Sequence, residues 1–194
     1  MKKISKVLLF TLLFMGVGSI SAQRKIDYVN PLIGTNGMGH TFPGACVPNG
    51  LIQLSPDTDT VPHNVDGAYQ PRAYEYCAGY QYHDKSIVGF SHTHLNGTGH
   101  SDLGDILVMP VVGKVKFNPG TAENPDAGYR SRFSHDTEKA HPGYYSVLLD
   151  DYGVRAEMTA TQRVGVHKYT FPGGEAHILL DLIHGIYNLS LIHI

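Results

Sequence analysis

Apolar and polar residues alternate with a period of two along much of the chain after residue 22. The clearest case is residues 154–161, where apolar side chains at the even positions as far as Ala160 alternate with polar ones at the odd positions. This period places alternate side chains on opposite faces of a β-strand, so the segment predicts a strand with one buried face. Just before it, Asp150–Gly153 reads Asp-Asp-Tyr-Gly and predicts a tight hairpin turn.

Other short runs of β-branched and aromatic residues are separated by Gly, Pro, Asn or Asp, which is typical of strands joined by turns. Residues 176–186 have the pattern of an internal strand. No segment predicts a helix. About eight strands without helices predict an all-β chain, folded as an antiparallel β-sandwich. The remaining predicted strands are Leu51–Ser55, Ser86–Ser91, Asp105–Val112, Lys114–Asn118, Gly143–Leu149, Val164–Phe171 and Ala176–Ile183.

The N-terminus has the pattern of an export signal. Three lysines within the first six residues precede an apolar run over residues 7–18, and small residues follow as far as Ala22. We predict a signal peptide over residues 1–22 and one mature domain over residues 23–194. The apolar run is shorter than the roughly 20 residues of a membrane span, so we expect no transmembrane segment. The expected location is outside the cytoplasm, in the periplasm or at the outer surface of a Gram-negative bacterium.

Charge and cysteine content narrow the function classes. The 15 basic and 17 acidic side chains nearly balance, and no basic cluster follows residue 6. This excludes a nucleic-acid partner, which requires a basic surface to neutralise phosphates. The two cysteines, Cys46 and Cys77, would form a disulfide in an oxidising compartment or stay as two buried thiols. Spacing alone leaves both alternatives open.

Two segments, residues 30–48 and 96–104, are dense in Gly, Asn, Thr and His. Loops of this composition on a rigid sheet are common places for binding residues. We therefore expect these two loops to hold any chemistry in the chain. Residues 118–136 read instead as a plain surface loop without a role.

The densest polar cluster covers residues 89–105 and includes His92 and His94. If a strand continues to Leu95, both imidazoles point to the same face, about 7 Å apart. A His-x-His pair on a strand can hold zinc. The alternatives are structural histidines within a loop and polar groups that bind a ligand, and we favour the last. Single alanine substitutions of these histidines are then expected to spare the fold.

His100, Asp102 and Asp105 extend the cluster. They would complete a zinc site with His92 and His94, the arrangement of a small zinc hydrolase. The two carboxylates would also suit an acid and base pair for glycoside hydrolysis. Because they lie three residues apart in a glycine-containing loop, their more common role is to stabilise a turn.

Several motifs resemble glycoside hydrolase family 92, a family of α-mannosidases. The opening Tyr-Val-Asn-Pro-Leu-Ile-Gly-Thr at residues 28–35 and the Ser-His-Thr-His-Leu-Asn-Gly-Thr-Gly run at residues 91–99 are the most specific. The resemblance extends from Ile26 to Tyr187, while Asn188–Ile194 matches nothing in the family. The other segments are His40–Ala45, Val47–Gly50, Gln53–Thr58, Ala78–Tyr82, Gly89–Asp105, Met109-Pro110, Pro142–Tyr145 and Ala156–Arg163.

The resemblance implies a galactose-mutarotase-like N-terminal β-sandwich that precedes a much larger (α/α)6 barrel. It also implies an exported, calcium-dependent, inverting exo-α-mannosidase whose substrate is a mannose-containing glycan of the N-glycan type. Family members place the catalytic carboxylates and most calcium contacts in the barrel. We therefore expect no catalytic residue and no metal ligand in this chain, and expect it to be truncated before its partner, the missing C-terminal catalytic domain.

In this interpretation the chain contributes loops to the substrate pocket but is inactive alone. A free-standing carbohydrate-binding module is the alternative, and a small His/Asp zinc hydrolase is the less favoured one. A wall of a mannose pocket needs neutral, directional donors and acceptors, which these loops provide. The candidate substrate-binding residues are Asn36, His40, His92, His94, Gly97, Thr98, His100, Asp102 and Asp105.

Overall fold

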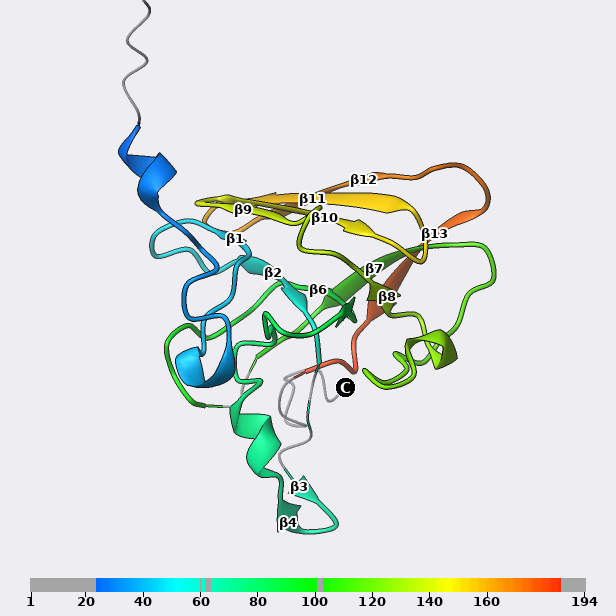
Figure 1. Cartoon of the computed structure of the whole chain (residues 1–194), viewed down its shortest axis with the longest axis horizontal. Coiled ribbons are helices and arrows are strands. Elements are labelled where there is room, and N and C mark those ends of the chain that lie inside the picture. The colour runs from blue at the N-terminus through cyan, green and yellow to red at the C-terminus, as the bar shows by residue number, and fades with distance from the viewer. Residues whose placement is uncertain (1–23, 60, 62–63, 101–102, 186–194) are drawn as a thin grey trace, which may run out of the picture.

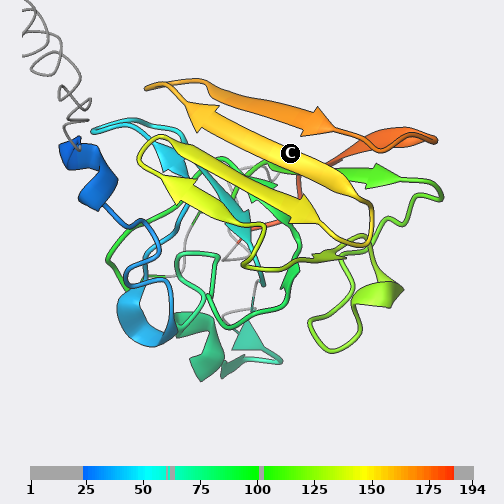
Figure 2. The same cartoon turned by 45° about the horizontal axis from the view of Figure 1, so that its top comes forward.

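The computed structural model describes residues 24–59, 61, 64–100 and 103–185. Two antiparallel sheets form its two layers (Figures 1 and 2), so the predicted all-β sandwich is confirmed. The larger sheet has the strand order β1-β2-β6-β7-β13 and the smaller one has the order β12-β11-β10-β9. The predicted signal peptide lies outside the described residues.

The larger sheet consists of β1 (Ala45–Cys46), β2 (Gln53–Asp57), β6 (Gly89–Ser91), β7 (Leu107–Val112) and β13 (Ala176–Asp181). The smaller sheet consists of β9 (Lys139–His141), β10 (Tyr144–Leu149), β11 (Val154–Ala160) and β12 (Gly165–Thr170). Two short pairs stand apart: β3 (Asn64–Val65) with β4 (Ala68–Tyr69), and β5 (Ser86–Ile87) with β8 (Ser131–Arg132).

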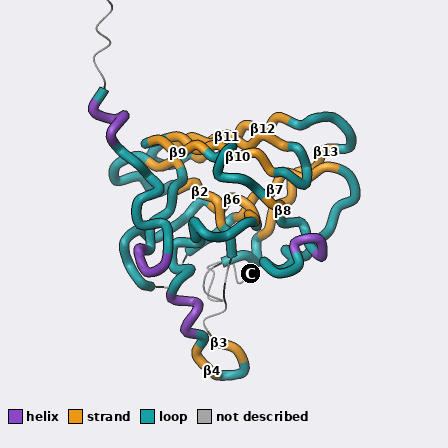
Figure 3. The backbone as a smooth tube through the Cα atoms, in the orientation of Figure 1, coloured by secondary structure: helices purple, strands orange, loops and turns teal. Residues whose placement is uncertain are grey.

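Helical structure in the described part of the chain is limited to four single turns of 3-10 helix, and Figure 3 shows them outside the two sheets. They are η1 (Lys25–Tyr28), η2 (Gly37–Gly39), η3 (Pro71–Tyr74) and η4 (Pro125–Ala127). Within the described residues, no helix is long and apolar enough to cross a membrane.

The core lies between the two sheets and follows the predicted alternation. On β11, Val154, Ala156, Met158 and Ala160 are buried, while the intervening side chains are half-buried or exposed. The strand pairs with β10 around a turn at residues 150–153, so the predicted hairpin is confirmed. The facing side chains come from the larger sheet and include Leu54, Phe90, Leu107, Met109 and Val111.

Three sequence predictions about strands are wrong. Residues 114–118 form no strand, because Gly113 adopts a positive φ of 82° and its N–H donates to the carbonyl of Glu175 at the turn into β13. Residues 86–91 divide at Val88 into β5 and β6, which belong to different sheets. Residues 176–186 have the sequence pattern of an internal strand. Within the described residues, however, β13 is the edge strand of the larger sheet, with Ile178 and Leu180 exposed on one face.

Residues 118–136 are not the plain surface loop that the sequence predicts. Tyr129 and Phe133 are buried in the core, and Arg130 is buried beside them. The Tyr129 hydroxyl donates to Asp181 at 2.6 Å and thereby ties the segment to the end of β13. Cys46 and Cys77 are free thiols, half-buried and buried respectively, which answers the question that their spacing left open.

Candidate functional site

The two predicted polar loops lie side by side at one end of the sandwich (Figure 1). The N–H of Gly97 donates to the carbonyl of His40 at 2.6 Å, and this bond joins the loops directly. Both residues have positive φ, 72° for Gly97 and 49° for His40, so the backbone turns sharply on each side of the contact. We call the surface formed by residues 36–41 and 96–100 the loop junction.

Tyr74 of η3 packs beneath the loop junction. Its ring meets the edge of the His40 ring, with 4.6 Å between the ring centroids. Gly99 also lies against it, because a Cβ at this position would fall 2.2 Å from atoms of the Tyr74 ring. A side chain at position 99 would therefore displace Tyr74. The exposed Thr98 and His100 flank this close contact.

His40 is buried, and its Nε2 has no hydrogen-bond partner among the described residues. A buried polar nitrogen without a partner costs about 1–3 kcal/mol, so a polar ligand atom or water that reached it would be favoured. The sequence predicted His40 as a binding residue, and that role stays a prediction, because this nitrogen is buried from solvent.

Asn36 lies at the other side of the loop junction. Its Oδ1 accepts a hydrogen bond from His83 Nδ1 at 2.7 Å. The following residue, Gly37, makes two hydrogen bonds to the buried side-chain amide of Gln81. Its N–H donates to Gln81 Oε1 at 2.7 Å, and its carbonyl accepts from Gln81 Nε2 at 3.0 Å. This amide clamp fixes the backbone that carries Asn36. A small cavity of about 320 Å³ opens here, lined by Asn30, Leu32, Gly34, Thr35, Asn36 and Tyr82.

A larger groove of about 650 Å³ lies beside the same loops. Its walls come from the first polar loop, the segment after β6 and the turn between β9 and β10. The lining is mostly apolar with a few amide and imidazole groups, the usual composition of a small-molecule pocket. Lining residues include Phe42, Cys46, Gln53, Leu95, Asn96 and His141.

His94 lies in the wall of this groove but is buried. It is 3% exposed, its Nδ1 lies 2.7 Å from the carbonyl oxygen of Gln53, and its Nε2 lies 2.8 Å from Asp57 Oδ1. Both ring nitrogens are therefore held by buried oxygens of the protein. The expectation that His94 and His92 share a strand face is wrong, because β6 ends at Ser91. Substrate contact by His94 stays a prediction, and the geometry gives it a structural role.

Asp57 is fully buried and is the centre of a charged cluster that the sequence analysis missed. Its second oxygen lies 2.8 Å from Nε2 of His184, which follows β13. Burial alone would raise the pKa of Asp57, but the charge of His94 and the hydrogen bonds from both imidazoles outweigh it and hold this pKa well below the usual range. The cluster links three segments that are distant in sequence: the end of β2, the segment after β6 and the segment after β13.

His92 lies apart from His94, at the edge between the two sheets. Its Nδ1 donates to the carbonyl of Ile106 at 2.7 Å, and its Nε2 lies 3.1 Å from Nε2 of His167 on β12. The predicted partners His94 and His100 make no such contact. A zinc hydrolase built on His92, His94 and an aspartate is therefore not the arrangement observed.

Asp105 is tied to Thr93, whose hydroxyl accepts from the Asp105 N–H at 3.0 Å and donates to its carboxylate at 3.2 Å. These two bonds fit the turn-stabilising role for Asp105. Asp102 lies outside the described residues. Within the described residues, no group of three or more His, Cys, Asp or Glu side chains is placed to hold a metal ion.

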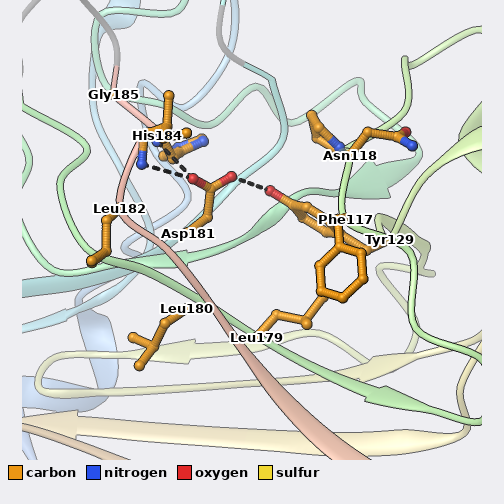
Figure 4. Close-up of a pocket in the computed structure, with 11 residues that line it drawn as sticks. Phe117, Asn118, Tyr129, Leu179, Leu180, Asp181, Leu182, His184 and Gly185 are labelled. Atoms are coloured by element: carbon orange, nitrogen blue, oxygen red, sulfur yellow. Dashed lines mark hydrogen bonds between the residues drawn. The ribbon is translucent and has the colours of Figure 1, made fainter.

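A further cavity of about 600 Å³ lies at the end of β13, where residues 179–185 line it together with residues 117–119 and Tyr129 (Figure 4). Asp181 forms part of the cavity wall. Its carboxylate accepts hydrogen bonds from the Tyr129 hydroxyl and from the N–H groups of Ile183 and His184. Asn118 and His184 also line the cavity, and most of the other lining residues are apolar. Among these, Phe117 is 87% exposed and Ile183 is 94% exposed.

Two packed antiparallel sheets that carry a polar loop junction define an all-β domain whose loops, rather than its core, offer a binding surface. The N-terminal domain profile of glycosyl hydrolase family 92 matches residues 28–192. The chain therefore belongs to this family, as its N-terminal domain.

The chain is similar to solved mannosidases of this family. One from Bacteroides thetaiotaomicron, in complex with mannoimidazole, is 47% identical with a TM-score of 0.77, over 85% of this chain and 20% of that one. An inverting mannosidase from B. thetaiotaomicron VPI-5482 is 28% identical with a TM-score of 0.60, over 82% and 20% of the two chains.

A curated relative, an uncharacterized secreted glycosidase from Arthroderma benhamiae, is 32% identical over 183 residues, which make up 86% of this chain and 21% of the relative. The present chain thus spans about a fifth of the length of these proteins.

Proposed function

We propose that this chain is the N-terminal domain of an exported, calcium-dependent, inverting exo-α-mannosidase that acts on mannose-containing glycans. The observation that carries the proposal is the 47% identity, at a TM-score of 0.77, to an α-mannosidase solved with mannoimidazole. Inversion is proposed from the similarity to the inverting relative, and export from the similarity to the secreted one. The N-terminal Lys-rich and apolar pattern supports a periplasmic or outer-surface location.

The loop junction is the proposed contribution of this chain to the substrate pocket. Thr98 and His100 are exposed there and offer polar groups to a sugar hydroxyl, and the buried His40 supports this loop through its carbonyl, which accepts from the Gly97 N–H. Asn36 and the backbone at Gly97 complete the polar edge. The scaffold behind this edge consists of Tyr74, which packs under the loops, and the buried His94 and Asp57.

The catalytic carboxylates and the calcium site belong, in this proposal, to the part of the parent protein beyond this chain. The described residues hold no cluster suited to a metal ion of that coordination number. An inverting glycosidase needs its two carboxyl groups about 6.5–9.5 Å apart, with water between them. The apolar surface around Phe117, Leu180 and Ile183 is the proposed contact with the remainder of the parent protein.

The test is to assay an activated α-mannoside with this chain alone and with the full-length parent protein. We expect turnover by the parent only. Turnover by the chain alone that is lost in Asp102→Asn or Asp105→Asn would overturn the proposal, whereas turnover that survives both substitutions marks a contaminant. Tight binding of mannose-containing glycans by the chain alone would instead support the carbohydrate-binding module. His100→Ala in the parent should weaken turnover and leave the thermal midpoint unchanged.

A further inference from the structure

His92 and His167 present two imidazole nitrogens to each other across the gap between the two sheets. Their Nε2 atoms are 3.1 Å apart, and their ring centroids are 5.0 Å apart with 47° between the planes. His92 follows β6 of the larger sheet, and His167 lies in the middle of the edge strand β12 of the smaller one. The absence of a side chain at Gly165 leaves room, since a Cβ there would approach the His92 ring to 3.2 Å.

The opposite nitrogen of each ring is already held by the protein. His92 Nδ1 donates to the Ile106 carbonyl at 2.7 Å, which leaves the lone pair of the neutral ring on Nε2. His167 Nδ1 lies 2.7 Å from the hydroxyl of Tyr169. A metal-binding histidine almost always has its second nitrogen held in this way, because the second bond fixes the tautomer and the direction of the ring.

We propose that His92 and His167 form a two-histidine site for a borderline transition-metal ion such as Zn²⁺. A tetrahedral zinc ion with bonds of about 2.0–2.1 Å holds two nitrogens roughly 3.3 Å apart. The observed 3.1 Å therefore needs an adjustment of only a few tenths of an ångström. Water molecules complete the coordination sphere, because the described residues provide no third His, Cys, Asp or Glu there.

The hydrogen bonds around the two rings allow both to act as ligands. Without metal, His167 Nε2–H donates to His92 Nε2, and the Tyr169 hydroxyl donates to His167 Nδ1. When metal binds, the His167 proton is on Nδ1 and donates to the Tyr169 oxygen. The ring changes tautomer and no net proton is released.

The site is separate from the proposed mannosidase function and from its calcium. Imidazole nitrogens suit Zn²⁺, Cu²⁺ and Ni²⁺, whereas Ca²⁺ takes oxygen ligands. Bound metal would link the end of β6 to β12 and thereby fasten the edge of one sheet to the other. We therefore expect zinc to raise the thermal midpoint of the protein.

The experiment is a Zn²⁺ titration of the metal-free full-length protein against a chromogenic chelator, with excess Ca²⁺ present throughout. We expect a zinc site that is lost in His92→Gln and in His167→Gln and retained in the control His177→Gln. Tyr169→Phe should bind zinc roughly tenfold more weakly, because it removes the support of His167 Nδ1. The rise in thermal midpoint with zinc should disappear in the same two variants.

Absence of zinc binding by the wild-type protein, or equal binding by both glutamine variants, would overturn the proposal. If a glutamine variant does not fold, imidazole NMR of the wild-type protein decides. Zinc must then perturb the resonances of His92 and His167, and perturbation of other histidines alone refutes the site. Because every readout is metal binding, its failure leaves the mannosidase proposal untouched.

Discussion

Replacement of His94 by alanine separates a structural role from a ligand-binding one. The substitution removes a fully buried imidazole from Asp57, whose other oxygen stays bonded to His184. Removing one partner of a buried ion pair typically costs about 3–5 kcal/mol. For a domain of this size each kcal/mol lowers the thermal midpoint by roughly 2–4 °C, so the expected decrease is about 6–20 °C.

The assay is thermal unfolding followed by circular dichroism, with His100→Ala as the matched control. His100 is exposed in the loop junction, and its removal should change the midpoint by no more than the small amount typical of surface substitutions. A His94→Ala midpoint equal to that of the control would refute the buried ion pair. In that case the original expectation of a ligand-facing His94 would return.

Three further predictions concern the same interior. Because the folded pKa of Asp57 is depressed below its unfolded value near 4, its contribution to stability is present above that pH and is lost as the pH falls further. Acid titration of the denaturation midpoint checks this, and Asp57→Asn should flatten the profile. Gly79→Ala should lower the free energy of unfolding by more than about 1 kcal/mol, because φ at residue 79 is 76° and the new Cβ would lie 2.1 Å from Asp57 Oδ1. An unchanged free energy in urea unfolding would contradict this. Glu138→Ala should lower the free energy of unfolding by about 1–3 kcal/mol in the same assay, since the hydroxyls of Tyr80 and Tyr145 both donate to that carboxylate. Tyr80→Phe leaves the carboxylate bonded to Tyr145 and should lower it by less.

The strands that the sequence predicts well are those whose two faces meet different environments. On β11 one face packs into the core and the other faces away from it, so apolar and polar residues alternate clearly over residues 154–160. The β10–β11 turn is equally local, since Asp150–Gly153 contains the residues that such turns require. Both features depend on neighbouring residues and can be derived without knowing the rest of the fold.

The break between β5 and β6 depends on distant residues instead. Ser86 pairs with Arg132 of β8, whereas Ser91 pairs with Ser55 of β2, and nothing within residues 86–91 indicates the change of partner. The buried Tyr129 was missed for a similar reason. Its segment is rich in turn residues, and its burial depends on a hydroxyl that reaches Asp181, 52 positions along the chain.

The many polar and ionisable side chains at residues 91–105 indicate where a site lies, but they do not indicate which role each side chain has. His92, His94 and His100 have the same side chain within nine positions, yet one meets His167 between the sheets, one is buried on Asp57 and one is exposed. Their directions diverge because β6 ends at Ser91, and beyond that point the strand period no longer orients side chains. A buried carboxylate such as Asp57 requires charged or polar partners, and the motif provides one of them, the buried His94. The remaining polar groups of the same loop are then free to face a ligand, so scaffold and binding surface arise from one continuous segment.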